Sequence, residues 1–175
     1  MATTFEAIAR TTVGSGGAST ITFSSIPATY TDLALLICAR ITGSSDPTIR
    51  IRCNGDSGAN YSYVALSGSG SGTSSYNQSN VGSGNTFLNA GYVTNSSDLA
   101  SIFSNNFVYI ENYTASTNKN WYVDGIDESN VTANSMQMIS GLWSNSAVIS
   151  SLVISQGTDS YAEFTTATLY GIKNS

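Results

Sequence analysis

The sequence consists of short stretches that favour β-strands, each closed by residues that favour turns, and this pattern restricts the chain to an all-β fold. The stretches 20–23 and 48–53 alternate apolar and polar residues, which is the period of a strand with one buried face. Helical periodicity is nearly absent. Without a helical layer, the pattern predicts an antiparallel β-sandwich, jelly-roll-like, with two stacked sheets. About ten or eleven strands are predicted, at 5–13, 20–23, 31–41, 48–53, 61–67, 86–94, 103–114, 120–125, 135–143, 148–155 and 162–172.

One of these stretches differs from the others because it is apolar on both faces. Leu33 to Ala39 carries no strongly polar side chain, so we predict a central strand that is covered on each side. After the strand at 48–53, Asn54-Gly55 indicates a tight turn, since both residues readily adopt a positive φ.

The composition is even along the chain, which predicts a single domain over residues 1–175. The segment 68–85 is rich in Gly, Ser and Asn, so we predict a flexible loop there. A loop of this length in a compact domain is usually functional or disordered. We therefore expect it and the first dozen residues to lie at subunit contacts, and the residues expected at these contacts are Phe5, Tyr76, Asn77 and Asn80.

Charged residues make up only 10% of the chain, and the net charge is −5 with six basic residues. Nucleic acid is excluded as a partner, because binding to phosphates needs clustered Lys and Arg. No apolar stretch approaches the ~20 residues of a membrane span, and the first residues lack the pattern of a signal peptide, so no membrane partner is expected. A neutral polar surface suits permanent packing against other chains and equally suits exposure outside the cell.

Candidate catalytic and metal-binding groups are few. The sequence has no histidine, which removes Ser-His-Asp and Cys-His arrangements and most zinc sites. Asp124, Asp127 and Glu128 form the closest group of carboxylates, and we interpret them as a solvated turn in preference to a calcium site or a catalytic pair. Cys38 and Cys53 are interpreted as buried free thiols, with a disulfide left open. The sequence predicts no catalytic residue, no metal ligand and no cofactor.

The chain contains ten tyrosines and two tryptophans. Alternation places most of these rings in strands, where packing in the core or at an interface is the favoured interpretation. The alternative is an exposed surface that stacks on sugar rings, with Trp121 and Trp143 as the glycan contacts.

Three sequence motifs are spread over most of the chain. They are FSSIPATYTDL at 23–33, CNGD at 53–56 followed by NYS at 60–62, and LYGI at 169–172. Together they resemble motifs of a family of small structural proteins from the virions of tailed bacteriophages. Cys53 replaces the aromatic residue that usually precedes Asn-Gly-Asp, which leaves the turn intact and changes the local packing. The motifs are structural, and none of them is catalytic.

The resemblance implies a non-enzymatic virion protein on the capsid surface. Such a decoration or cement protein would stabilise the capsid by binding across subunits of the major capsid protein, and would associate with itself, as a homotrimer. The alternative that the resemblance leaves open is a tail or fibre module that recognises a host surface glycan. The chain shows no coiled coil or repeat region of the kind that a long tail fibre needs, which favours the decoration role.

Overall fold

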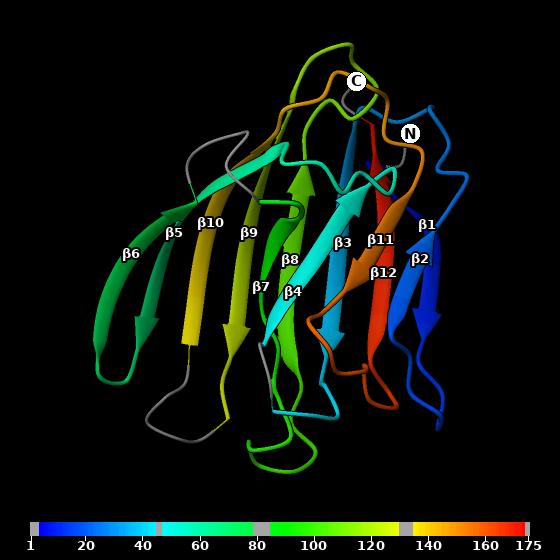
Figure 1. Cartoon of the computed structure of the whole chain (residues 1–175). Coiled ribbons are helices and arrows are strands. Elements are labelled where there is room, and N and C mark those ends of the chain that lie inside the picture. Colours follow the sequence, from blue (N-terminus) through cyan, green and yellow to red (C-terminus); the bar gives the residue numbers. More distant parts are fainter. Residues whose placement is uncertain (1–3, 45–46, 79–84, 130–134, 174–175) are drawn as a thin grey trace.

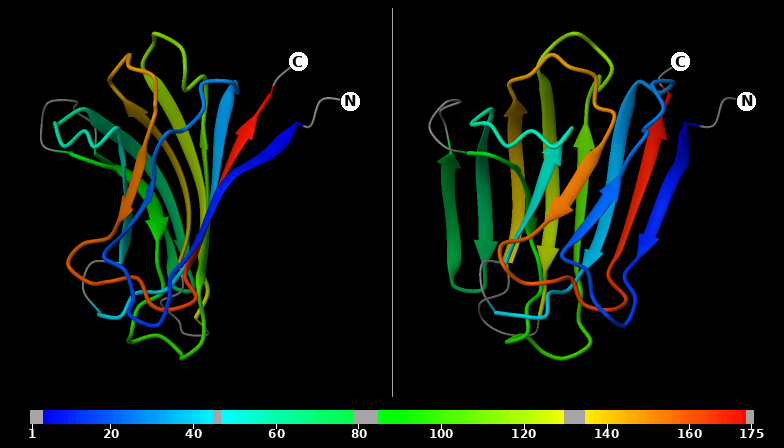
Figure 2. Two further views of the ribbon diagram at one scale, coloured as in Figure 1. Left: turned by 90° about the vertical axis from the view of Figure 1, so that its right-hand side faces the viewer. Right: turned by 45° about the vertical axis from the view of Figure 1, so that its right-hand side comes forward.

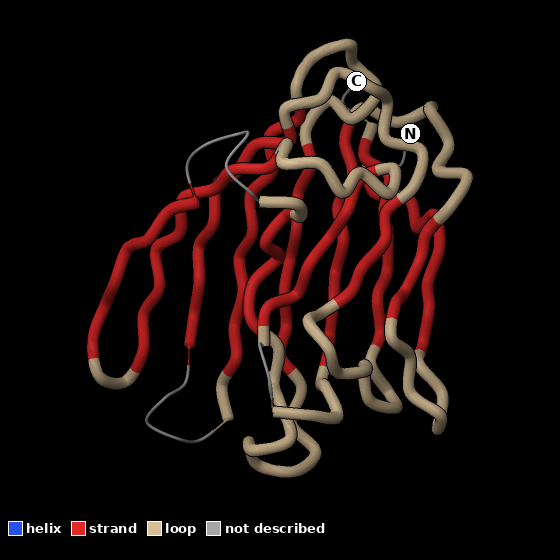
Figure 3. Tube along the Cα trace, viewed as in Figure 1, coloured by secondary structure: helices blue, strands red, loops and turns tan. Residues whose placement is uncertain are grey.

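The computed structural model describes residues 4–44, 47–78, 85–129 and 135–173. Figure 3 shows strands and loops within these ranges and no helix. Accordingly, no described helix is long and apolar enough to cross a membrane. The described residues form the strands β1 (Phe5–Thr12), β2 (Thr20–Phe23), β3 (Asp32–Ala39), β4 (Thr48–Cys53), β5 (Tyr61–Ser69), β6 (Gly72–Gln78), β7 (Leu88–Tyr92), β8 (Ser104–Ile110), β9 (Lys119–Asp127), β10 (Ser135–Trp143), β11 (Leu152–Ser155) and β12 (Thr166–Ile172).

The strands form two antiparallel sheets (Figure 1). The larger sheet has eight strands in the order β1-β12-β3-β8-β9-β10-β5-β6, and the smaller sheet has four in the order β2-β11-β4-β7. The left view of Figure 2 shows them as two layers. The predicted all-β sandwich is therefore confirmed.

The pairing of the strands is nested. β1 pairs with β12, β2 with β11, β3 with β8 and β4 with β7. This is the pattern of one long hairpin that has been rolled up so that its two legs alternate between the sheets, and it is compatible with the jelly-roll-like description. The pairs β5–β6 and β9–β10 extend only the larger sheet, which therefore has twice as many strands as the smaller one.

A single apolar core lies between the two sheets. Leu35 and Ile37 of β3 point into it from the larger sheet, and Ile49 and Ile51 of β4 point into it from the smaller one. Each of these side chains is at most 1% exposed. Full burial of an aliphatic side chain contributes about 1.5–3 kcal/mol, so these inward faces hold the two layers together.

Three aromatic rings form the part of the core nearest to β5 and β10. The ring of Tyr61 lies 6.3 Å from that of Trp143 and 6.5 Å from that of Trp121. The indole Nε1 of Trp143 donates a hydrogen bond to Oδ2 of Asp56 at 2.7 Å. The turn after β4 is thereby attached to the far end of β10.

The prediction of a flexible loop at 68–85 is wrong for much of that segment. Residues 72–78 form the edge strand β6, and each of them has a partner in β5. The sequence Thr-Ser-Ser-Tyr-Asn can alternate its side chains about a strand, and the turn at Gly70-Ser71 brings it back against β5. Residues 79–84 of the predicted loop lie outside the described residues.

The prediction that β3 is covered on both faces is also wrong. β3 is an inner strand of the larger sheet, but the smaller sheet covers only one side of it. Leu36, which points to the other side, is 48% exposed. An apolar residue at the middle of a central strand thus faces solvent in the isolated chain.

Candidate functional surface

The face of the eight-stranded sheet that points away from the smaller sheet, here called the outer face, is the main apolar surface of the described chain. Monomeric soluble proteins rarely expose large contiguous apolar patches, and such patches usually mark contacts with other molecules. Among the described residues, the strands of the smaller sheet expose no large apolar side chain. The strands of the larger sheet expose Phe5, Leu36, Val64, Leu66, Tyr122, Ile126, Met136 and Met138.

The outward face of the smaller sheet is polar by comparison. It presents Thr22 together with Arg50 and Arg52. The guanidinium carbon of Arg50 lies 4.7 Å from the centre of the Phe87 ring, and Nε of Arg52 donates a hydrogen bond to the carbonyl oxygen of Thr86 at 3.1 Å. The side chains of both arginines are therefore engaged in contacts within the chain.

Direct cross-strand pairing places one continuous row of side chains across the outer face. Arg10 and Asp124 stand at the same level as Leu36, each two strands away from it, on opposite sides. Since neighbouring strands are ~4.8 Å apart, each charge lies about 10 Å from the line of β3. From β1 to β6 the row is Arg10, Thr168, Leu36, Phe107, Asp124, Met138, Leu66 and Ser75.

Phe107 of this row forms an aromatic cluster with Tyr109 and Tyr122. Tyr109 and Tyr122 are 5.5 Å apart between ring centres, and Phe107 lies 5.9 Å from Tyr122. The hydroxyl of Tyr109 donates a hydrogen bond to Oδ2 of Asp32 at 2.7 Å. Burial and the Asp32 carboxylate raise the pKa of Tyr109 to about 12, so its hydroxyl stays protonated and anchored at neutral pH. Tyr122, by contrast, is 45% exposed.

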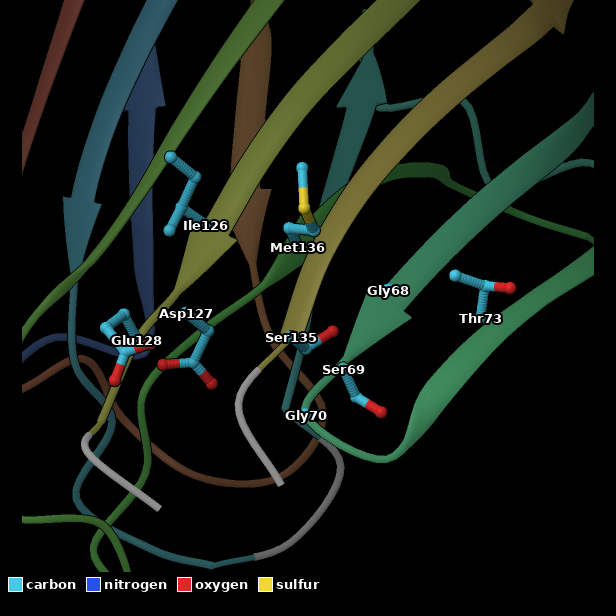
Figure 4. Close-up of a pocket in the computed structure, with 9 residues that line it drawn as sticks. All are labelled: Gly68, Ser69, Gly70, Thr73, Ile126, Asp127, Glu128, Ser135 and Met136. Carbon is cyan, nitrogen blue, oxygen red and sulfur yellow. The ribbon is translucent and has the colours of Figure 1, made fainter. Parts of the chain in front are cut away.

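Several shallow hollows also lie on the outer face, with volumes of about 440, 400, 360 and 320 Å³. Figure 4 shows the largest of them, at the ends of β9, β10 and β5. Ile126 and Met136 lie along its upper side in that view, and Asp127 and Glu128 lie below them. The hollows give the apolar surface a relief into which side chains of a partner can fit.

The predicted carboxylate turn is not formed as expected, because Asp124 and Asp127 both belong to β9. Asp124 is exposed on the outer face, whereas Asp127 is half-buried and accepts a hydrogen bond from the Thr94 hydroxyl at 2.7 Å. Burial and the nearby Asp98 raise the pKa of Asp127. The described residues contain no group of three or more His, Cys, Asp or Glu side chains placed to hold a metal ion.

The two tryptophans named as glycan contacts do not lie at the surface. Trp121 and Trp143 are 2% and 1% exposed, and both rings belong to the core. Alternation along β9 and β10 turns them inward, in agreement with the favoured interpretation of core packing. The exposed sugar-stacking platform is therefore not built from these residues.

The four residues expected at subunit contacts have different positions. Phe5 is 49% exposed on β1, and Asn77 is exposed on β6. β1 and β6 are the two edge strands of the larger sheet. Tyr76 is instead half-buried against the core, and its hydroxyl accepts a hydrogen bond from Nε2 of Gln137. Asn80 lies outside the described residues.

Both cysteines are free. Cys53 is buried at the end of β4, whereas Cys38 is only half-buried, because it points to the outer face from β3. Burial raises the pKa of both thiols, most strongly that of Cys53. The interpretation as two buried thiols is thus correct for Cys53 and incomplete for Cys38.

Comparisons of the chain with family models, with curated proteins and with solved structures gave no match.

Proposed function

We propose that this protein is a non-enzymatic structural component of a tailed-bacteriophage virion that lies on the capsid surface and stabilises it by binding across subunits of the major capsid protein. The supporting observation is the apolar outer face, which is carried by an eight-stranded sheet and needs a partner to cover it. The motif resemblance supplies the kind of assembly to which that partner would belong.

The capsid contact is assigned to one part of the outer face, the apolar flank formed by Val64 and Leu66 of β5 and Met136 and Met138 of β10. These side chains are 54%, 55%, 54% and 60% exposed. Met138 and Leu66 are direct cross-strand partners, so the flank is continuous. Methionine side chains adapt readily to an irregular apolar partner, which suits a protein that must fit several slightly different capsid positions.

The experiment that tests the function is icosahedral cryo-electron microscopy of the intact virion, with the copy number measured by quantitative mass spectrometry. Ordered density for this domain at regular positions on the head, in hundreds of copies, is the expected result. Density at the tail alone, in a few copies, would contradict the decoration role.

We expect the double substitution Leu66→Asp and Met138→Asp to reduce binding to undecorated capsids at least about 100-fold, because two unpaired carboxylates would have to be buried in the contact. The thermal midpoint of the free protein should change little, since both side chains are more than half exposed. Binding is measured by co-sedimentation with purified capsids.

The matched control for this variant is Thr20→Asp with Thr22→Asp, which adds the same two charges to exposed positions of β2 on the other sheet. The control should bind capsids as the parent does. Equal binding by the flank variant and the control would place the capsid contact elsewhere.

A host-glycan receptor module is the second candidate, and the aromatic cluster of Phe107, Tyr109 and Tyr122 supports it. A stacked pair with one exposed ring is the type of surface on which a sugar can pack, and the Asp124 carboxylate lies on the same face. If this is the function, the parent protein should be retained on host polysaccharide and Tyr122→Ala should not. Neither protein should bind capsids.

A further inference from the structure

We propose that a second copy of this chain covers the outer face over the five strands β1, β12, β3, β8 and β9, with a twofold axis that runs along β3 in the plane between the two sheets. Such an axis turns one copy over onto the other, so that β3 faces β3 and β1 of each copy faces β9 of its partner.

Charge placement favours this axis. Arg10 and Asp124 stand at one level of the sheet, at equal strand distance on either side of Leu36. Rotation about β3 therefore brings Arg10 of each copy over Asp124 of the other, and two equivalent ion pairs form. A twofold axis that lies in the same plane but runs at right angles to the strands would place Arg10 over Arg10 and Asp124 over Asp124. The face is self-complementary in the first arrangement alone.

The side chains on and beside the axis also match. Leu36, which is 48% exposed in the isolated chain, would meet Leu36 of the second copy and become buried. On either side of Leu36 in β3, the outward residues are the smaller Ala34, which is already covered within one chain, and the half-buried Cys38, so neither projects beyond Leu36. Tyr170 on β12 and Tyr109 on β8 are the cross-strand partners of Ala34 on its two sides. In the pair, Tyr170 of one copy would face Tyr109 of the other.

The overlap of the five strands is large enough for a specific contact between two copies. Five strands at ~4.8 Å spacing and about seven residues at ~3.3 Å rise give a contact of roughly 24 Å by 23 Å, or about 550 Å² on each copy. Both copies together contribute about 1,100 Å², which exceeds the minimum of about 1,000 Å² for a biological interface and lies just below the lower end, about 1,200 Å², of the range for stable complexes.

The remaining strands of the larger sheet, β10, β5 and β6, extend beyond this overlap. The apolar flank of each copy therefore stays open in the pair, at two symmetric positions. The pairing does not depend on the proposed capsid role and is tested on the purified protein alone, so each proposal can fail without the other.

The first test is the mass of the purified full chain by sedimentation velocity, over a range of protein concentrations. We expect a mass of two copies for the parent. Arg10→Asp and Asp124→Arg should each weaken dimerisation at least about tenfold, because each change converts two attractive contacts into repulsive ones. The combined variant should recover dimerisation, since the charges are then exchanged. Leu36→Asp, which puts two carboxylates on the axis, should give monomers.

The matched control is Glu163→Arg, which changes the charge by the same amount as Asp124→Arg at an exposed position outside the strands. It should dimerise as the parent does. A monomeric parent, a trimer whose mass is unaffected by these substitutions, or a combined variant as weak as the single ones would overturn the proposal.

Cross-linking gives a second, independent measurement. Cys38 lies on the proposed axis, so the two copies of its side chain point toward each other between sheets that are ~10 Å apart, and the two thiols are closer together than the sheets. A bis-maleimide of matching reach should join two parent chains, and Cys38→Ser should prevent this while leaving the sedimentation mass at two copies. Cys53 is buried and does not compete. A parent dimer that the reagent fails to join would place its interface on another surface.

Discussion

We expect Gly141→Ala to destabilise the folded chain by about 3 kcal/mol, near the upper end of the usual cost of overpacking a core. The ring of Trp121 lies directly over Gly141, its cross-strand partner in β9. A Cβ atom at position 141 would stand 2.1 Å from Cζ2 of Trp121, so the ring must move. Trp121 is only 2% exposed and belongs to the core, so a movement of its ring disturbs the packing of its neighbours. Urea unfolding followed by tryptophan fluorescence measures the change.

The control for this prediction is Gly14→Ala, because an added Cβ there meets no atom within 4 Å. Its unfolding free energy should stay within about 0.5 kcal/mol of the parent. Removing the ring should relieve the clash: in a double-mutant cycle, Gly141→Ala and Trp121→Leu should couple by at least about 1 kcal/mol. Additive effects of the two changes would show that the ring does not cause the loss.

Asp56→Ala should cost about 3 kcal/mol, since hydrogen bonds to charged groups contribute about 1.5–3 kcal/mol each and the buried indole N–H of Trp143 would be left unpaired. Oδ2 of Asp56 accepts from the Trp143 indole at 2.7 Å and from Nδ2 of Asn60 at 2.9 Å, while Oδ1 accepts from the backbone nitrogen of Gly58 at 2.8 Å. Asp56→Asn, which keeps the shape and one acceptor oxygen, should lose about half as much. Equal stability of the parent and both variants would contradict this role.

The same carboxylate makes stability depend on pH in the acid range. Burial raises the pKa of Asp56, but the hydrogen bonds from Trp143, Asn60 and Gly58 more than offset this, and the pKa lies below its ordinary value of 3.8. A carboxylate with a depressed pKa contributes fully above its unfolded pKa and loses that contribution as the pH falls through its folded pKa. The unfolding free energy of the parent should therefore fall below about pH 4. In Asp56→Asn this fall should be shallower.

Much of the fold was predictable because local patterns and tertiary packing agree. The strands at 20–23, 48–53 and 135–143 begin and end at the predicted residues, since alternation and turn signals coincide there. β6 was missed because Gly, Ser and Asn have low strand propensity, and only pairing with β5 makes a strand of 72–78.

The candidate surface was harder to predict, because sequence patterns do not show which face of a strand a second sheet covers. In Met136-Gln137-Met138, hydropathy suggests that the methionines point inward. The structure has Gln137 buried and both methionines exposed, because Ile139 and Trp143 determine which face of β10 packs against the core. The apolar flank therefore became visible only once the register of β10 was known.

The nested pairing of the strands has a consequence for biosynthesis. Among the described strands, β1 comes first in the sequence, and the one strand that pairs with it, β12, comes after all the others. β2 likewise waits for β11. Pairing over such sequence distances makes folding slow, and a nascent chain keeps unpaired edges until β12 has been synthesised. A chain truncated before residue 166 would leave β1 without a neighbouring strand and one edge of β3 unpaired, and exposed edges of this kind recruit other chains. A chain truncated before β12 should therefore aggregate, and we do not expect it to fold as a smaller domain.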